Sequence, residues 1–313
     1  MISPKPLERP PVKHPVKKPK SMTIAIGMLC QGGAVIAADS RLSRPDGSTY
    51  TDRKVRVEKS ANGVFVVAFA ADDANAAHTL LDDLMEDLVQ GDPATLRETE
   101  DLVRPRMARW AAAYPYGIPN VELILGASTP APWAPERQNC GGVGLYFCQP
   151  PNTMNLRNCL EPDPAIYAGI GQGSTITDPL YKSLFGSMPG TKTCLKQIAY
   201  LIYRAKLDFA NGCGGDTTAV FLREQQPAAF EIAPIWMQVA ESTSAMFDGV
   251  LRVAASAVLS PTLEESMAMC DLFRSDLEFL KGYRARRFCT MFNQEICEDG
   301  VVREFPVDLP SED

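Results

Sequence analysis

The stretch TIAIGMLCQGGAVIAADSR, residues 23–41, decides the fold class of this 313-residue chain. It contains two short apolar runs, 24–30 and 34–38, separated by Gln31-Gly32-Gly33. Apolar runs of this length with a glycine turn between them are typical of buried strands joined by a tight connection. The stretch therefore predicts an antiparallel hairpin whose strands are covered on both faces.

The residues that follow predict a second hairpin and then two helices. Runs 54–58 and 64–69 are separated by Asn62-Gly63, which favours the positive φ of a tight turn. After Asp72 and Asp73, leucine and methionine recur at helical spacing up to Gly91. Asp92-Pro93 then supplies a capping residue and a proline at a first helical position, so we expect the second helix to open there.

The second half of the chain repeats this alternation of strands and helices. Strands are predicted at 121–126, 144–148 and 165–170, with an irregular loop at 128–139. A helix is predicted at 191–209, followed by strands at 217–222 and 228–232 and by helical segments at 237–259 and 263–287. Sheets separated by helix pairs in this order predict an α+β fold with four αββα layers and a helical C-terminal extension.

Composition and charge exclude several classes of protein. Hydrophobic residues make up 45% and charged residues 22%, the usual balance of a globular protein with a sizeable core. A net charge of -7 argues against nucleic acid as a partner. The nine cysteines form no CxxC pair and there are only two histidines, so a zinc site or a Ser/His/Asp triad is not expected.

The same composition divides the chain into three parts. Residues 1–21 are basic and rich in proline, which predicts a disordered arm. Residues 22–235 form the expected globular domain, and 236–313 form a mainly helical extension packed on it. No run is long and apolar enough to span a membrane, and the arm lacks the apolar centre of a secretory signal, so a cytoplasmic location is expected.

The first hairpin also carries a motif. Thr23 starts an apolar strand, Gly33 lies in the turn, and an alanine-rich strand ends in Asp39-Ser40-Arg41. This pattern resembles the start of the mature chain in proteasome β-type subunits, which are N-terminal-nucleophile hydrolases. The interval of 16 residues from Thr23 to Asp39 equals that of the family.

Three later segments extend the resemblance, which covers about residues 23–232. Asp52-Arg53-Lys54-Val55 resembles the segment that carries the family's active-site lysine, one residue short of the usual interval. Residues 169–174, GIGQGS, resemble the turn before a helix that supports the N-terminal amine. Residues 208–215, DFANGCGG, resemble the family's late Asp-x-x-Ser-Gly-Gly.

The resemblance implies a threonine-type peptidase that works through an acyl-enzyme. Thr23 would be the nucleophile, and its free α-amino group would be the base that takes the hydroxyl proton. Lys54 would favour the alkoxide and Asp39 would hold Lys54 in place. The remaining expected site residues are the catalytic Ser174, the oxyanion N–H near Ala70, and the supporting Arg41, Asp208, Cys213 and Gly214.

Three positions depart from the family pattern. Met22 stands where self-processing members have glycine, and Phe69-Ala70-Ala71 stands where the family usually has an oxyanion glycine. Cys213 stands for the family's serine, and Asp208 is two residues too far from it. Taken singly, Asp39 is typical of a strand end and Lys54 of a solvated lysine.

These departures leave several functions open. The first is a peptidase with a peptide substrate and no metal or organic cofactor. The second is a non-catalytic proteasome-like subunit or paralogue with a role in assembly or binding. The third is an amidase of the same superfamily that acts on small amides. The resemblance also implies a ring-like homo-oligomer and raises an ATPase as a partner.

Overall fold

The computed structural model describes residues 23–43, 48–114, 117–130, 142–156, 166–185, 188–224 and 227–259. In this part of the chain, twelve strands and five helices form a mixed α/β fold in which the strands pair antiparallel. Ten of the strands form two five-stranded sheets.

The first sheet is built around the predicted N-terminal hairpin. Its strands, in spatial order, are β10 (Tyr167–Ile170), β1 (Ala25–Cys30), β2 (Gly33–Asp39), β11 (Thr217–Arg223) and β12 (Ala228–Ile232). β1 and β2 pair from Ala25 opposite Ala38 to Cys30 opposite Gly33, which confirms this hairpin.

The second sheet contains the other predicted hairpin. Its strands, in spatial order, are β5 (Val55–Lys59), β6 (Val64–Ala71), β7 (Val121–Ser128), β8 (Val143–Gln149) and β9 (Asn152–Asn155). Each strand pairs antiparallel with its neighbour in sequence. Short turns join β5 to β6 and β8 to β9, whereas α1 and α2 lie between β6 and β7.

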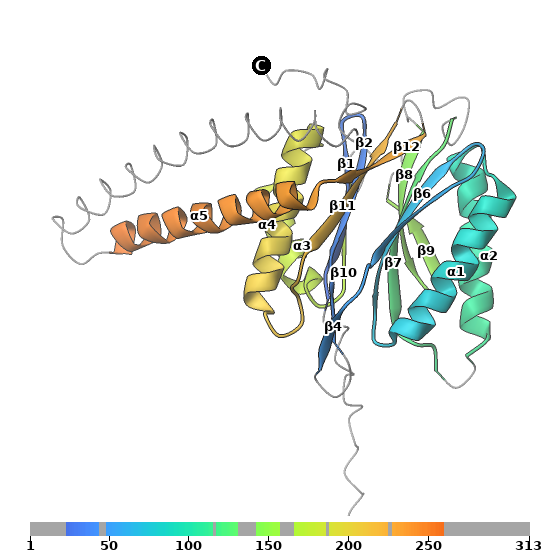
Figure 1. Ribbon diagram of the computed structural model, residues 1–313, viewed down its shortest axis with the longest axis horizontal. Helices are drawn as coiled ribbons and strands as arrows, with labels where there is room; N and C mark the ends of the chain where they lie inside the picture. The colour runs from blue at the N-terminus through green and yellow to red at the C-terminus, as the bar shows by residue number, and fades with distance from the viewer. Residues whose placement is uncertain are drawn as a thin grey trace, which may run out of the picture.

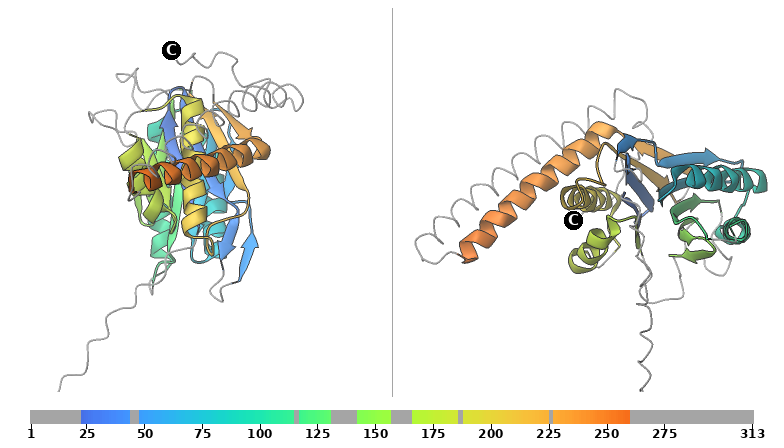
Figure 2. Two further views of the ribbon diagram at one scale, coloured as in Figure 1. Left: turned by 90° about the vertical axis from the view of Figure 1, so that its left-hand side faces the viewer. Right: turned by 90° about the horizontal axis from the view of Figure 1, so that it is seen from below.

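Helices cover the outward faces of the two sheets (Figure 1). The second sheet is covered by α1 (Ala74–Gly91) and α2 (Leu96–Ala112), and the first by α3 (Ser174–Leu184) and α4 (Thr191–Asp208). The first turns of α5 (Pro234–Leu259) lie against α4, and the helix then extends away from the body of the molecule (Figure 2).

Alternation of side chains along the strands creates three apolar layers. In β1, Ile26 and Met28 pack towards α4, whereas Ala25 and Leu29 face the other sheet. Small residues let the sheets approach closely: a Cβ on Gly27 would come within 2.6 Å of Ile124 Cγ2. Because both faces of the strand are buried, the apolar run in the sequence is continuous.

The helix pair on the second sheet begins at polar caps. Asp73 accepts the backbone N–H groups of Asn75 and Ala76 at the start of α1, and Thr95 accepts that of Glu98 at the start of α2. The expected opening of the second helix at Asp92-Pro93 is therefore wrong by three residues. Asp92 instead ends α1 with a left-handed φ of 41°.

Three short strands are absent from the sequence-based prediction. β3 (Arg41–Ser43) and β4 (Thr49–Thr51) pair with each other, and β9 lies at a sheet edge. The residues of β4 and β9 are exposed or half-buried, so these strands lack the apolar alternation that reveals a buried strand. Their pairing is a backbone interaction, which leaves no signal in the composition.

The C-terminal helix begins slightly earlier than expected. α5 starts at Pro234 rather than near residue 237, which suits proline because a first helical position needs no N–H bond. No helix in the described ranges is long and apolar enough to span a bilayer. The arm at 1–21, most of the loop at 128–139 and the helix at 263–287 lie outside the described residues.

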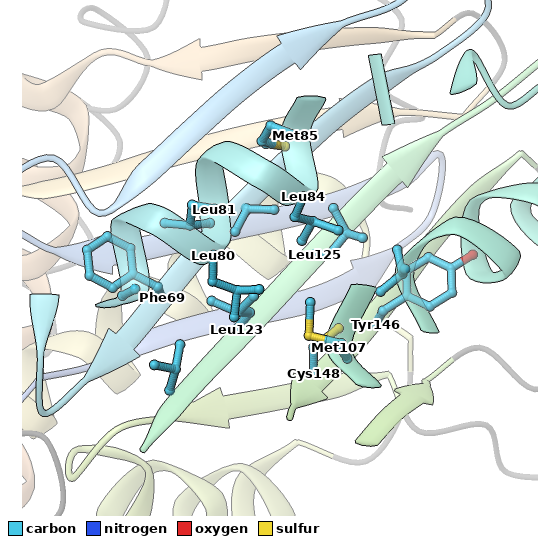
Figure 3. Close-up of a cluster of buried hydrophobic side chains, with 14 of the residues drawn as sticks. Phe69, Leu80, Leu81, Leu84, Met85, Met107, Leu123, Leu125, Tyr146 and Cys148 are labelled. Atoms are coloured by element: carbon cyan, nitrogen blue, oxygen red, sulfur yellow. The ribbon is translucent and has the colours of Figure 1, made fainter. Parts of the chain in front are cut away.

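The packing of α1 on the second sheet predicts a large effect of one truncation. Leu84 is fully buried among leucines, methionines and aromatic residues (Figure 3). We expect Leu84→Ala to lower the free energy of unfolding by about 2–5 kcal/mol in urea denaturation, because it leaves a cavity. Val89→Ala, on the same helix but 37% exposed, is the control and should change it by less than about 0.5 kcal/mol. Equal effects of the two would contradict this packing.

Candidate functional site

The register of the first hairpin brings two of the expected site residues together. Ala25 lies opposite Ala38, so the start of β1 is beside the end of β2. The Asp39 N–H donates to the carbonyl of Ile24 at 3.2 Å, and this places Thr23 next to Asp39. Lys54 comes from the other sheet, immediately before β5.

The side chains of these three residues form one cluster. The Thr23 hydroxyl donates to Asp39 Oδ1 at 2.8 Å. Lys54 Nζ lies 2.5 Å from the same carboxylate oxygen and also donates to Thr23 Oγ1. A third bond from the ammonium goes to the carbonyl oxygen of Arg41. A hydroxyl, an ammonium and a carboxylate are therefore in mutual contact.

Burial controls the electrostatics of the cluster. Thr23 and Asp39 have no exposed surface, and Lys54 is 1% exposed. Removal from water lowers the pKa of Lys54 below its ordinary value of 10.5, and the neighbouring Asp39 carboxylate opposes this shift. A buried ammonium in contact with Oγ1 can stabilise negative charge that develops on that oxygen.

Backbone N–H groups fix the orientation of the carboxylate. Asp39 Oδ1 accepts the N–H of Ile24 at 3.2 Å, and Oδ2 accepts the N–H of Gly214 at 2.7 Å. Both carboxylate oxygens therefore have donors besides Lys54. The carboxylate is held by the chain itself, which in turn holds the ammonium.

Arg41 holds the loop that carries Gly214. Its guanidinium donates to the carbonyl of Ala210 at 2.5 Å and to that of Cys213 at 3.4 Å. A Cβ on Gly214 would come within 2.6 Å of the guanidinium carbon of Arg41, so a side chain at this position would displace the guanidinium. The resemblance implies supporting roles for all three of Arg41, Cys213 and Gly214, and they lie together here.

Cys213 is in the right place for a structural role but is poorly suited to attack a carbonyl. It is 1% exposed, and burial raises the pKa of its thiol to about 12. Asp39 raises this pKa further, and Lys54 opposes the shift. The thiol is protonated at neutral pH and is therefore a weak nucleophile.

The turn before α3 packs directly on the backbone of Thr23. The N–H of Gly173 donates to the carbonyl of Thr23 at 3.1 Å. Gly171 has a φ of +77°, and a Cβ there would lie 2.4 Å from the same carbonyl oxygen. The Ser174 hydroxyl donates to the Gly171 carbonyl at 2.7 Å, so Ser174 stabilises the turn.

The two other expected residues are Ala70 and Asp208. Ala70, at the end of β6, is buried between the sheets in the same apolar layer as Ala25 and Ala38. Asp208 ends α4, and its carboxylate accepts from Arg204 at 3.3 Å. The described hydrogen bonds of the cluster do not include Asp208.

Glu122 belongs to the site although no motif indicates it. Its Oε2 accepts the N–H of Gly171 at 2.8 Å. The signal in the sequence is weak: a single carboxylate in the otherwise apolar stretch VELILGA, residues 121–127. A single carboxylate in a strand usually faces solvent. Only the hydrogen bond to Gly171 shows that Glu122 belongs to the site.

The described residues show no metal centre. Within the ranges that the structure covers, no group of three or more His, Cys, Asp or Glu side chains could hold a metal ion.

Similarity to known proteins is found at the level of structure. No protein-family model matches the sequence, and no curated protein matches it either. Anbu from Hyphomicrobium sp. strain MC1 is similar in fold, with 16% identity and a TM-score of 0.58, over 75% of this chain and 97% of that chain.

Two other Anbu structures are similar to the same extent. For Anbu (ancestral beta-subunit) from Yersinia bercovieri the identity is 15% and the TM-score 0.59, over 74% of this chain and 97% of that chain. For a helical assembly of the Anbu complex from Pseudomonas aeruginosa the identity is 16% and the TM-score 0.54, over 74% of this chain and 96% of that chain. At these identities the likeness is one of fold, and it supports a proteasome-like fold.

The buried ion pair predicts a strong effect of one substitution. Lys54→Met removes the ammonium and leaves the Asp39 carboxylate buried without its cation. We expect the free energy of unfolding to fall by about 3–5 kcal/mol in urea denaturation at neutral pH. Lys59→Met, at an exposed position of β5, is the matched control and should change it by less than about 0.5 kcal/mol.

The lowered pKa of Lys54 also predicts a pH dependence. Between its folded pKa and 10.5, the unfolded chain binds more protons at this residue than the folded chain does. The free energy of unfolding of the unmodified chain should therefore rise, relative to that of Lys54→Met, as the pH increases through this interval. A difference between the two proteins that stays constant up to pH 10.5 would contradict the shift.

Proposed function

We propose that this protein is an N-terminal-nucleophile amide hydrolase of the threonine-peptidase type, with Thr23 as its nucleophile. The observation that carries this proposal is the contact of one hydroxyl, Thr23 Oγ1, with both the Lys54 ammonium and the Asp39 carboxylate. Hydroxyl nucleophiles need a base and a stabilising charge, and a free α-amino group on Thr23 would supply the base. We assign the arrangement of sheets and helices to the four-layer αββα class of these hydrolases.

The proposed reaction follows from these groups. The free amine of Thr23 takes the proton from Oγ1 as this oxygen attacks the substrate carbonyl. The Lys54 ammonium stabilises the developing negative charge on Oγ1, and a backbone N–H near Ala70 receives the oxyanion. The protonated amine then gives its proton to the leaving nitrogen, which produces an acyl-enzyme. Water, deprotonated by the amine, hydrolyses this ester and regenerates Thr23.

Cleavage after Met22 is the step that the proposal requires before catalysis. While Met22 is attached, the Thr23 nitrogen belongs to a peptide bond and cannot act as a base. Thr23 also has no exposed surface in the full chain. Where translation begins at Met22, a methionine aminopeptidase would release the amine, because threonine is a small residue.

Self-association is the second part of the proposal. One similar structure is a helical assembly of the Anbu complex from Pseudomonas aeruginosa. By this analogy we propose a homo-oligomer, ring-like or helical, with its catalytic groups inside. A peptide or small amide would be the substrate, an ATPase would be the class of partner that delivers it, and the cytoplasm would be the compartment.

A non-catalytic role in assembly or binding is the alternative. It is favoured by the complete burial of Thr23 and by Ala70, which stands where the family usually has an oxyanion glycine. In that case Met22 stays attached, and the buried Lys54–Asp39 pair serves stability alone. The two functions differ at the nitrogen of Thr23. It is a free amine in the catalytic protein and part of a peptide bond in the non-catalytic one.

The first test is the identity of the first residue of the mature protein. We expect intact-mass spectrometry of the native protein to give a chain that begins at Thr23. Periodate treatment of the denatured protein should then shift this mass, since periodate cleaves between carbons that bear an adjacent amine and hydroxyl. A native chain that still carries Met22 and resists periodate would rule out the proposed catalytic state.

The second test is activity on fluorogenic peptide amides and small amides. In a chain that begins at Thr23, Thr23→Ala should reduce kcat/KM by more than about 10³-fold, because the nucleophile is lost. Thr23→Ser keeps the hydroxyl and the amine and should retain measurable activity. Thr79→Ala, at an exposed position of α1, is the control and should behave like the unmodified chain.

A further inference from the structure

A half-buried carboxylate, Glu122, lies at the edge where the two sheets meet. Glu122 is the second residue of β7. Side chains two positions apart on a strand point to the same face, so Glu122 is on the face of Ile124, which packs in the layer between the sheets. Leu123 and Leu125 are on the other face of β7 and pack beneath α1 and α2. Glu122 therefore points from the second sheet towards the first.

The carboxylate is bonded to the turn that supports the proposed nucleophile. Its Oε2 accepts the N–H of Gly171 at 2.8 Å. Gly171 contacts the carbonyl of Thr23 so closely that no Cβ fits between them, and Gly173 donates to that carbonyl. A displacement of this turn would therefore displace Thr23.

The backbone of Glu122 is tied to the strand that would receive the oxyanion. In the β6–β7 ladder, Glu122 lies directly opposite Ala70. One residue thus connects the end of β6, through its backbone pair, with the Gly171 turn, through its side chain. The nucleophile and the proposed oxyanion donor come from different sheets, and Glu122 spans the gap between them.

We propose that Glu122 is a positioning residue, which holds Thr23 at the correct distance from the backbone N–H near Ala70. This inference rests on the proposed function. The layer between the sheets contains many apolar residues, among them Ala25, Ala38 and Ala68, and Lys54 with Asp39 is another polar contact that joins the sheets. Apolar contacts are non-directional, whereas a hydrogen bond to a carboxylate is directional and defines the spacing.

Kinetics of matched variants test this role. In a chain that begins at Thr23, Glu122→Ala should lower kcat by about 10²-fold and leave KM nearly unchanged, because small displacements of reacting groups have effects of that size. Glu122→Gln keeps an oxygen that can accept the Gly171 N–H, so it should retain kcat within a few-fold. Glu58→Ala removes an exposed carboxylate from β5 in the same sheet and is the control.

Two kinetic outcomes would overturn the inference. The first is a normal kcat for Glu122→Ala. The second is a loss in Glu122→Gln as large as that in Glu122→Ala, since this would assign the effect to charge. An inactive unmodified chain that begins at Thr23 would instead count against the proposed function, which separates the two failures.

Hydrogen exchange tests the contact without any activity. We expect the Gly171 amide of Glu122→Ala to exchange about tenfold faster than in the unmodified chain, because it loses its acceptor. The same amide in Glu122→Gln and in Glu58→Ala should exchange at the unmodified rate. Equal rates in all four proteins would overturn the inference even where the chain is catalytically active.

Discussion

The structure depends on one buried ion pair, Lys54 with Asp39. Neither side chain reaches solvent, and an isolated charge in such a place would be strongly destabilising. The ammonium therefore needs every acceptor around it: the Asp39 carboxylate, the Thr23 hydroxyl and the Arg41 carbonyl. Because Lys54 enters the second sheet and Asp39 ends a strand of the first, the pair also joins the two sheets at one edge.

The chain around this pair is built from residues that leave space for it. A Cβ on Gly171 would block its close approach to the backbone of Thr23, and a Cβ on Gly214 would displace the guanidinium of Arg41. Backbone N–H groups point at the carboxylate and at the Thr23 carbonyl from two separate loops. The same small residues that allow close packing thus make the cluster rigid, which both a catalytic and a purely structural site would require.

The C-terminal helix is coupled to this edge through the strand beside Asp39. Thr217 lies opposite Asp39 in the β2–β11 ladder, and its hydroxyl bonds with Glu241 of α5. Lys206 of α4 completes the network, with Nζ 2.8 Å from Thr217 Oγ1 and 2.8 Å from Glu241 Oε2. The start of α5 is therefore fixed to the core by charge as well as by apolar contact, although the helix leaves the body further on (Figure 1).

The sequence by itself determined the two hairpins and most helices, because strand alternation and turn residues are local signals. The grouping of Thr23, Asp39 and Lys54 as one site came instead from the resemblance of their segments to proteasome β-type subunits. Only the tertiary structure decided that Ser174 bonds to its own turn, that Asp208 pairs with Arg204, and that Glu122 crosses to Gly171. It also added the short strands β3, β4 and β9, which backbone pairing holds without an apolar pattern. For Glu122 the physical reason is distance along the chain: a hydrogen bond between residues 49 positions apart leaves no periodicity in the sequence. Ser174 and Asp208 have partners only three and four positions away, and for them the folded geometry decided which neighbour each side chain bonds.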